Sequence, residues 1–414
     1  MRLPRLLLVI GPGLAIAATG VGAGDLMSAM MAGARHSTAL IWVIVAGALL
    51  KFALNEGVAR WQLATGTTLI EGWTDHIGRP LLAYFTLYLT VWGVIVAAGL
   101  MAACGVAAHA LWPQLPISLW AVLHSLLALA LVWNGRYAVF ENVMKSLILV
   151  MVISLLGSVA MLKPDWGQAV SSLLRPTLPA GSAPSALSLM GGVGGSVTLL
   201  SYGYWIREKG WRGTQRMADC RIDLAVGYLL TGLFSVAMLV LAATVLGSLG
   251  ELPPGSRGLV ACADAIGEAA DERAGIGTAA RLIFLVGVWG AIFTSMIGVW
   301  QGVPWLFAET LQQWTGRRHE PVDPRGRLYR GGLLLLAIPP MILLALGRPV
   351  WLVQLYTALS GLFMPLLAAT LLRLNRQPSL VSGLRLGPVA TATLVVALLL
   401  FAAVLIRQLV DLTG

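Results

Sequence analysis

Gly11-Pro-Gly-Leu-Ala-Ile-Ala-Ala-Thr-Gly-Val-Gly-Ala-Gly-Asp25 is apolar enough to enter a membrane, yet it cannot form one continuous helix. Gly20, Gly22 and Gly24 fall within five residues, and glycine weakens a helix because its backbone is the least restricted. We therefore expect an unwound stretch here, with backbone carbonyls that lack helical partners. Asp25 follows directly, and an ionisable side chain within a membrane span indicates a functional site. Carbonyls beside a carboxylate predict a cation site. The alternative is that the glycines serve close helix packing and that Asp25 lies at a hydrated helix end.

The composition around this segment is that of an integral membrane protein. Of the 414 residues, 58% are apolar and 11% are charged, whereas soluble domains contain about 25% charged residues. Apolar stretches long enough to cross a bilayer recur along the chain, and we predict one all-α transmembrane domain over residues 1–414. Its eleven expected spans lie at about 6–32, 39–64, 80–111, 115–133, 138–161, 185–206, 219–248, 276–303, 330–346, 349–374 and 384–411.

The net charge of +10 follows the loops. Lys and Arg collect on every second loop, and the positive-inside bias then places the N-terminus in the cytoplasm and the C-terminus outside. We expect a multi-pass protein of a plasma or bacterial inner membrane, in contact with lipid and without a nucleic-acid partner. Three cysteines, Cys104, Cys220 and Cys262, are too widely spaced for a disulfide framework or a zinc site. We find no nucleophile with its base and no phosphate loop, so the sequence does not predict an enzyme.

The sixth expected span is also interrupted by glycines. It reads Gly191-Gly-Val-Gly-Gly-Ser-Val-Thr-Leu-Leu-Ser-Tyr-Gly203. Two broken helices five spans apart are typical of transporters built from inverted repeats, which hold their substrate at the midplane between the breaks. We therefore predict repeats over 1–161 and 185–374, with an extra helix at 384–411. Tight packing of small residues is the competing explanation for either cluster alone.

Four short motifs resemble the natural resistance-associated macrophage protein (Nramp) family of divalent metal transporters. They are Gly11-Pro-Gly13, Ala64-Thr-Gly66, Phe140-Glu141 and Pro164-Asp-Trp-Gly167, in the family's order and at similar spacing over most of the chain. The resemblance implies the eleven-span form of the leucine-transporter fold and alternating access around a metal site.

The chain also departs from that family at the implied metal site. Where the family has Asp-Pro-Gly-Asn in the first broken helix, this chain has Gly22-Ala-Gly-Asp25. Where the family has a carbonyl-donating Ala and then a Met in the sixth span, the chain has Gly195 and Thr198. The resemblance therefore implies a divergent member with Asp25 and Thr198 as metal ligands, within a set of substrate-binding residues that comprises Gly22, Gly24, Asp25, Gly195, Thr198 and Ser201.

This change of ligands predicts a change of ion. A Met thioether favours softer transition metals, whereas carboxylate, carbonyl, hydroxyl and water suit Mg²⁺, Ca²⁺ or Mn²⁺. A roomy site with one carboxylate suits Mg²⁺, which usually keeps several waters. A lone carboxylate equally suits a monovalent ion.

Other polar residues in the spans are candidates for coupling or gating: Lys51, Glu56, Glu141, Thr294 and Ser295. Lys51 shares a helix face with Asn55, and if it reaches Asp25 or Glu141 it would act as a built-in cation. The alternative is a purely structural buried pair. Thr294-Ser295 is similar to a hydroxyl pair that helps to hold sodium in the leucine-transporter fold, whereas the family's proton-route His after the sixth-span break is absent.

The leading prediction is secondary-active or facilitative transport of a divalent metal ion, Mg²⁺ or Mn²⁺, by alternating access. The alternative is a symporter of a small organic solute on the same fold, coupled to Na⁺ or H⁺. A sensor that does not transport is less favoured. We expect a monomer whose partners are the metal ion and the lipid bilayer, and no cofactor beyond the transported and coupling ions.

Overall fold

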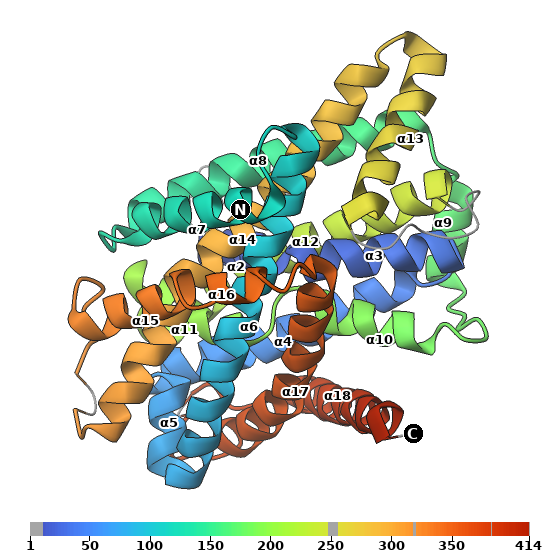
Figure 1. Cartoon of the computed structure of the whole chain (residues 1–414). Coiled ribbons are helices and arrows are strands. Elements are labelled where there is room, and N and C mark those ends of the chain that lie inside the picture. Colours follow the sequence, from blue (N-terminus) through green and yellow to red (C-terminus); the bar gives the residue numbers. More distant parts are fainter. Residues whose placement is uncertain (1–10, 247–255, 318–319, 382, 414) are drawn as a thin grey trace.

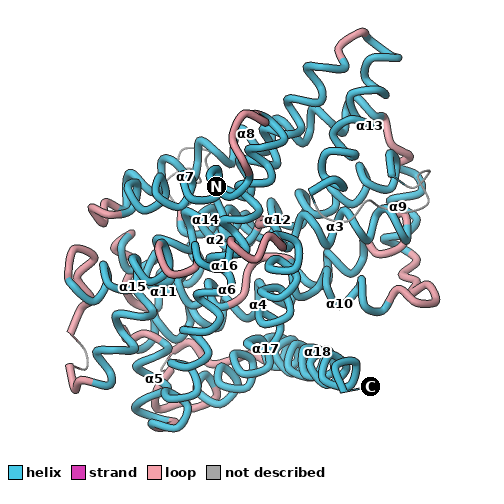
Figure 2. The backbone as a smooth tube through the Cα atoms, in the orientation of Figure 1, coloured by secondary structure: helices cyan, strands magenta, loops and turns pink. Residues whose placement is uncertain are grey.

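The computed structural model describes residues 11–246, 256–317, 320–381 and 383–413, in which every regular element is a helix (Figure 1; Figure 2). Eight helical segments are long and apolar enough to cross a membrane. They are α4 (Ile41–Thr65), α6 (Arg79–Leu111), α8 (Tyr137–Leu162), α10 (Ala183–Gly192) with α11 (Ser201–Glu208), α12 (Met217–Leu246), α14 (Gly277–Trp314), α15 (Arg327–Ala337) with α16 (Met341–Leu344), and α17 (Pro349–Asn375).

A ninth span is the bent pair α2 (Pro12–Gly20) and α3 (Ala23–His36). Two further apolar helical stretches are α7 (Ile117–Val132) and Pro388–Ala403, which belongs to α18 (Pro388–Thr413). Together these segments coincide in order with the eleven predicted spans. Residues 6–10 and 247–248 of the predicted first and seventh spans lie outside the described residues. The predicted all-helical, multi-span fold class with a broken first helix is confirmed.

The first span breaks where the glycine cluster predicts it. Its two halves, α2 and α3, meet at Val21 and Gly22 with a bend of 55°. None of the three clustered glycines has a positive φ. Glycine is needed here because a Cβ at Gly20 would lie 2.7 Å from the Cα of Gly194 and one at Gly22 would lie 2.6 Å from the Oγ of Ser295. The glycines of this segment therefore lie both at the bend between α2 and α3 and at close contacts with neighbouring segments.

The sixth span breaks at residues with a left-handed backbone conformation, unlike the first span. Gly194 and Gly195, between α10 and the 3₁₀ turn η1 (Val197–Leu200), have φ values of +79° and +81°. Residues with a Cβ rarely adopt this left-handed region, so glycine is the natural choice at both positions. This stretch interrupts the α-helix and separates α10 from α11. The two breaks lie against each other, as the contact between Gly20 and Gly194 shows.

One helix is longer than predicted. The eighth span was expected to end at residue 303, but α14 continues through Pro304 to Trp314, although proline lacks an N–H and usually ends or kinks a helix. The Tyr329 hydroxyl donates to the Gln301 carbonyl in this region at 2.9 Å, so a neighbouring helix supports the backbone beside the proline.

The remaining helices surround this core. α5 (Leu69–His76) follows α4 and precedes α6, α9 (Trp166–Leu174) lies in the connection between the fifth and sixth spans, and the short 3₁₀ helix η2 (Thr214–Arg216) leads into α12. α13 (Ser256–Ala274) packs against the start of α14, and the two project together from the rest of the protein (Figure 1). Inside, α12 runs along α2, α3 and α4, so the broken first span is enclosed by other helices.

Candidate functional site

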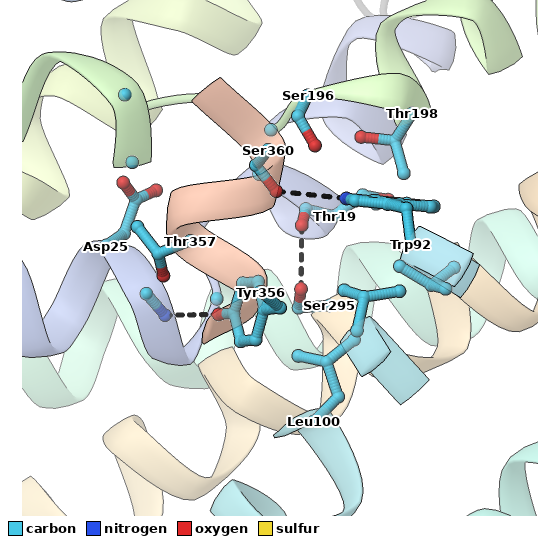
Figure 3. A pocket seen from close by; sticks show the side chains of 18 residues that line it. Thr19, Asp25, Trp92, Leu100, Ser196, Thr198, Ser295, Tyr356, Thr357 and Ser360 are labelled. Carbon is cyan, nitrogen blue, oxygen red and sulfur yellow. Dashed lines mark hydrogen bonds between the residues drawn. The ribbon is translucent and has the colours of Figure 1, made fainter. Parts of the chain in front are cut away.

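A small cavity of about 50 Å³ lies where the two broken helices meet (Figure 3). Both breaks contribute to its wall, and α6, α14 and α17 close the remaining sides. Its volume has room for roughly three waters. The lining comprises Thr19, Gly20, Gly22, Gly24, Asp25, Trp92, Val96, Leu100, Gly191, Gly192, Gly195, Ser196, Thr198, Ser295, Val299, Tyr356, Thr357 and Ser360.

Asp25 provides the one carboxylate in this lining. It lies in the first turn of α3, where the positive end of the helix dipole stabilises a negative charge. Its Oδ2 accepts the Gly194 N–H at 3.4 Å, whereas its buried Oδ1 has no hydrogen-bond partner. A buried carboxylate oxygen without a partner is costly. Asp25 is therefore the side chain best placed to bind a cation in the cavity.

The other polar side chains of the wall are hydroxyls, apart from one indole. They are Thr19, Ser196, Thr198, Ser295, Tyr356, Thr357 and Ser360, and the indole is that of Trp92. Several of these groups already form hydrogen bonds within the protein: for example, Trp92 donates to Ser360 at 3.0 Å, and the Gly24 N–H donates to Tyr356. The lining residues include no Met, His or Cys, so the wall offers only hard oxygen donors.

Lys51 is fully buried in α4 and turns toward the sixth-span break. Its ammonium donates to the Gly191 carbonyl at 2.8 Å and to the Gly195 carbonyl at shorter range. Both glycines line the cavity. Among the described residues Lys51 forms no ion pair with Asp25 or Glu141, so its hydrogen-bond partners are carbonyls that the break exposes.

Thr294 and Ser295 reach the first break, as their resemblance to a sodium-binding pair implies. Thr294 donates to the Ala18 carbonyl at 3.2 Å and Ser295 donates to the Thr19 carbonyl at 2.8 Å (Figure 3). The hydroxyls thus satisfy carbonyls that α2 leaves free at its C-terminal end.

The remaining predicted site residues lie away from the cavity. Ser201 begins α11 with its Oγ facing Gly302 of α14, where a Cβ would lie 2.5 Å away, and it does not line the cavity. Glu141 accepts from Lys145 at 2.7 Å and Lys209 at 2.8 Å. The pair with Lys145 is local, since the two residues are one turn apart on α8.

Glu56 is also held in an ion cluster outside the cavity. It accepts from Arg60 at 2.6 Å and from Arg221 of α12 at 2.9 Å. Asn55, on the Lys51 face of α4, donates to the Tyr228 hydroxyl at 3.2 Å. Both neighbours therefore contact α12, Asn55 through Tyr228 and Glu56 through Arg221.

Asp223 is a buried acid that the sequence analysis missed. It lies in α12 and accepts the N–H groups of Gly11 at 2.9 Å and Gly13 at 2.6 Å, and the hydroxyl of Tyr202 at 2.9 Å. It thus joins the N-terminus of α2 to α11. An acid within an apolar span was the available signal. The hydroxyls of α17 that line the cavity were missed too, since a Tyr, Thr or Ser in a span is common.

Two larger cavities lie elsewhere in the described part of the protein. One, of about 380 Å³, includes Ala102 and His109 near the end of α6 together with Arg348 and Leu352. The other, of about 360 Å³, includes Gln62 near the end of α4 and Glu71 of α5. The central cavity contacts the middle of α6 at Trp92, Val96 and Leu100. The central cavity is the smallest of the three and shares no lining residue with the other two.

The sequence matches one protein family over nearly its whole length. Residues 13–411 match the family model described as natural resistance-associated macrophage protein-like. The "Divalent metal cation transporter MntH" of Granulibacter bethesdensis is 24% identical over 253 residues, which is 58% of this chain and 55% of that protein. "Metal transporter Nramp5" of Oryza sativa subsp. japonica is 25% identical over 45% of this chain and 35% of its own length. The matched region thus spans about half or less of these relatives.

Solved structures agree over nearly the whole chain. A crystal structure of a variant of the Eremococcus coleocola manganese transporter has a TM-score of 0.79 at 16% identity, with 97% of this chain and 86% of that chain covered. Mhp1, a nucleobase-cation-symport-1 family transporter, has a TM-score of 0.58 at 14% identity, with 97% and 93% covered. These likenesses show the shared fold, which is the predicted leucine-transporter type.

Proposed function

This chain belongs to the natural resistance-associated macrophage protein-like (Nramp) family, and from that premise we propose that it transports a divalent metal ion across the membrane by alternating access. The observation that supports this most directly is the position of Asp25. Asp25 lines a cavity between two broken helices, which is where transporters of this architecture hold their substrate, and its buried Oδ1 has no hydrogen-bond partner. A cation would satisfy that oxygen.

The chemistry of the wall supports a preference for hard cations. The carboxylate of Asp25, the glycine carbonyls and the surrounding hydroxyls are all oxygen donors, which suit Mg²⁺ and Mn²⁺. With only one carboxylate, the ion would retain several of its waters. Thr198 stands where the family's Met is expected from the resemblance, and a hydroxyl cannot favour a soft metal as a thioether does.

The size of the cavity favours an ion over an organic solute. Sites for drug-sized organic molecules measure about 300–1,000 Å³, whereas this cavity measures about 50 Å³. An amine symporter would need considerable expansion here. The cytoplasmic N-terminus and the monomeric state stay predictions.

Uptake by purified protein in liposomes tests the proposal. We expect uptake of Mg²⁺ and Mn²⁺, compared with Ca²⁺, Cd²⁺, Na⁺ and small amines. Asp25→Asn should weaken divalent-ion binding, measured by calorimetry, at least a hundredfold, which corresponds to about 2.7 kcal/mol. Asp219→Asn is the matched control, because Asp219 forms an ion pair with Arg216 near the start of α12 and does not line the cavity. Uptake of amines without metal ions, or unchanged binding in Asp25→Asn, would refute the proposal. Repeating uptake with imposed Na⁺ and H⁺ gradients identifies the coupling ion.

A further inference from the structure

The ammonium of Lys51 occupies the part of the sixth span that a transported cation would use. Lys51 has no exposed surface, and it donates to the carbonyls of Gly191 and Gly195. The positive φ values at Gly194 and Gly195 belong to the turn that frees these carbonyls from the helix. Both glycines also line the central cavity. Lys51 therefore binds, from α4, the carbonyl groups of two glycines whose backbone lines the cavity.

This arrangement changes the charge that an entering ion meets. Asp25 is the one acid in the cavity wall, and Lys51 interacts electrostatically with it without forming an ion pair. One negative and one positive charge leave the empty site neutral. A metal ion bound to either glycine carbonyl would lie next to the ammonium on the same oxygen, and two cations that share an oxygen repel each other.

We propose that Lys51 is a specificity-determining residue, a tethered cation that competes with the transported metal ion for the sixth-span carbonyls and thereby weakens its binding. This inference rests on the proposed function and deepens it. Loading the site requires the ammonium to move away from the carbonyls, and its return helps to expel the ion. The repulsion is proportional to the charge of the ion, so it acts more strongly on dications than on monovalent ions.

Three substitutions separate charge from packing. Lys51→Gln removes the charge but keeps an N–H₂ donor for the carbonyls, Lys51→Met removes both, and Lys51→Arg keeps the charge. We expect Lys51→Gln and Lys51→Met to bind Mn²⁺ and Mg²⁺ at least tenfold more tightly than the unaltered chain, and Lys51→Arg to stay within about threefold of it. Isothermal calorimetry gives the dissociation constants, and a melting temperature for each variant shows that it is folded.

Lys145→Gln is the matched control. Lys145 is partly exposed, pairs with Glu141 on α8 and does not line the cavity, so its loss should leave ion binding unchanged. Weaker or unchanged binding in folded Lys51→Gln would overturn the inference, because it would make Lys51 a structural support of the break. An equal gain in Lys51→Arg would also overturn it, because the charge would then not be the cause.

The two proposals fail in different ways. If the unaltered protein takes up no divalent ion and Asp25→Asn changes nothing, the proposed function has failed. If uptake occurs and depends on Asp25 while Lys51→Gln gains no affinity, only the competition by Lys51 has failed. The release rate of Mn²⁺ from preloaded protein gives an independent check, since removal of the competing charge should slow it by a similar factor.

Discussion

Asp223→Asn is expected to loosen the first half of the broken first span. The carboxylate accepts three hydrogen bonds, from the N–H groups of Gly11 and Gly13 and from the Tyr202 hydroxyl. The two N–H groups belong to the start of α2, where the helix itself provides no acceptors. Asp223 therefore acts as a capping group supplied by α12, and through Tyr202 it also holds α11.

The magnitude follows from the number and kind of these bonds. A hydrogen bond to a charged group contributes about 1.5–3 kcal/mol, and a charge near a partly buried helix terminus contributes up to about 2 kcal/mol. Asparagine keeps one acceptor oxygen but presents an amide N–H₂ where the second oxygen was, so at least one of the three bonds is lost together with the charge. A shift of about 2 kcal/mol toward a detached α2 corresponds to roughly a thirtyfold change in the equilibrium.

Hydrogen exchange measured by mass spectrometry on peptides from α2 tests this expectation. Amides of α2 should exchange roughly thirtyfold faster in Asp223→Asn, while amides of α6 stay unchanged. Tyr202→Phe removes one of the three donors and should give a smaller increase, and Asp219→Asn, on the same helix, should give none. Unchanged exchange of α2 in a folded Asp223→Asn protein would refute the idea that this carboxylate fastens the helix.

Two further changes address the sixth-span break. Thr198→Met should shift the ion preference toward Cd²⁺, because it adds a soft ligand to the cavity wall. Competition of Cd²⁺ against Mg²⁺ in the unaltered protein and in the variant measures the shift. No shift would mean that this position does not contact the ion. Gly194→Ala should lower the melting temperature, because it puts a Cβ on a residue with φ of +79° and places that Cβ 2.7 Å from the Tyr228 ring. The two effects together should cost about 1–3 kcal/mol of stability. An unchanged melting temperature would show that the break relaxes easily.

The spans and both breaks could be predicted because they depend on local patterns. Runs of apolar residues specify membrane helices whatever their neighbours, and clustered glycines weaken a helix locally. The structural role of each individual glycine could not be predicted from these patterns. Gly194 needs its left-handed backbone, whereas Gly20 is required by a contact with a residue far along the chain. The division into two inverted repeats stays a prediction.

The partners of buried charges could not be predicted, because they come from helices distant in sequence. Lys51 was expected to meet a carboxylate, yet it donates to carbonyls more than a hundred residues away that become available only because the sixth span unwinds. Asp223 similarly meets backbone groups of a helix that precedes it by about two hundred residues. Sequence spacing indicates which residues share a helix face, but not what lies opposite that face.

The opposite charges of Asp25 and Lys51 also determine how an electric field acts on the protein. A site with one carboxylate and one ammonium carries no net charge, so the membrane potential does almost no work on that site when the empty protein changes conformation. A bound dication adds two charges, and moving them across the full membrane at 100 mV corresponds to about 4.6 kcal/mol. The membrane potential would then favour one direction of the conformational change that carries the bound ion. It would leave the return of the empty protein nearly unaffected.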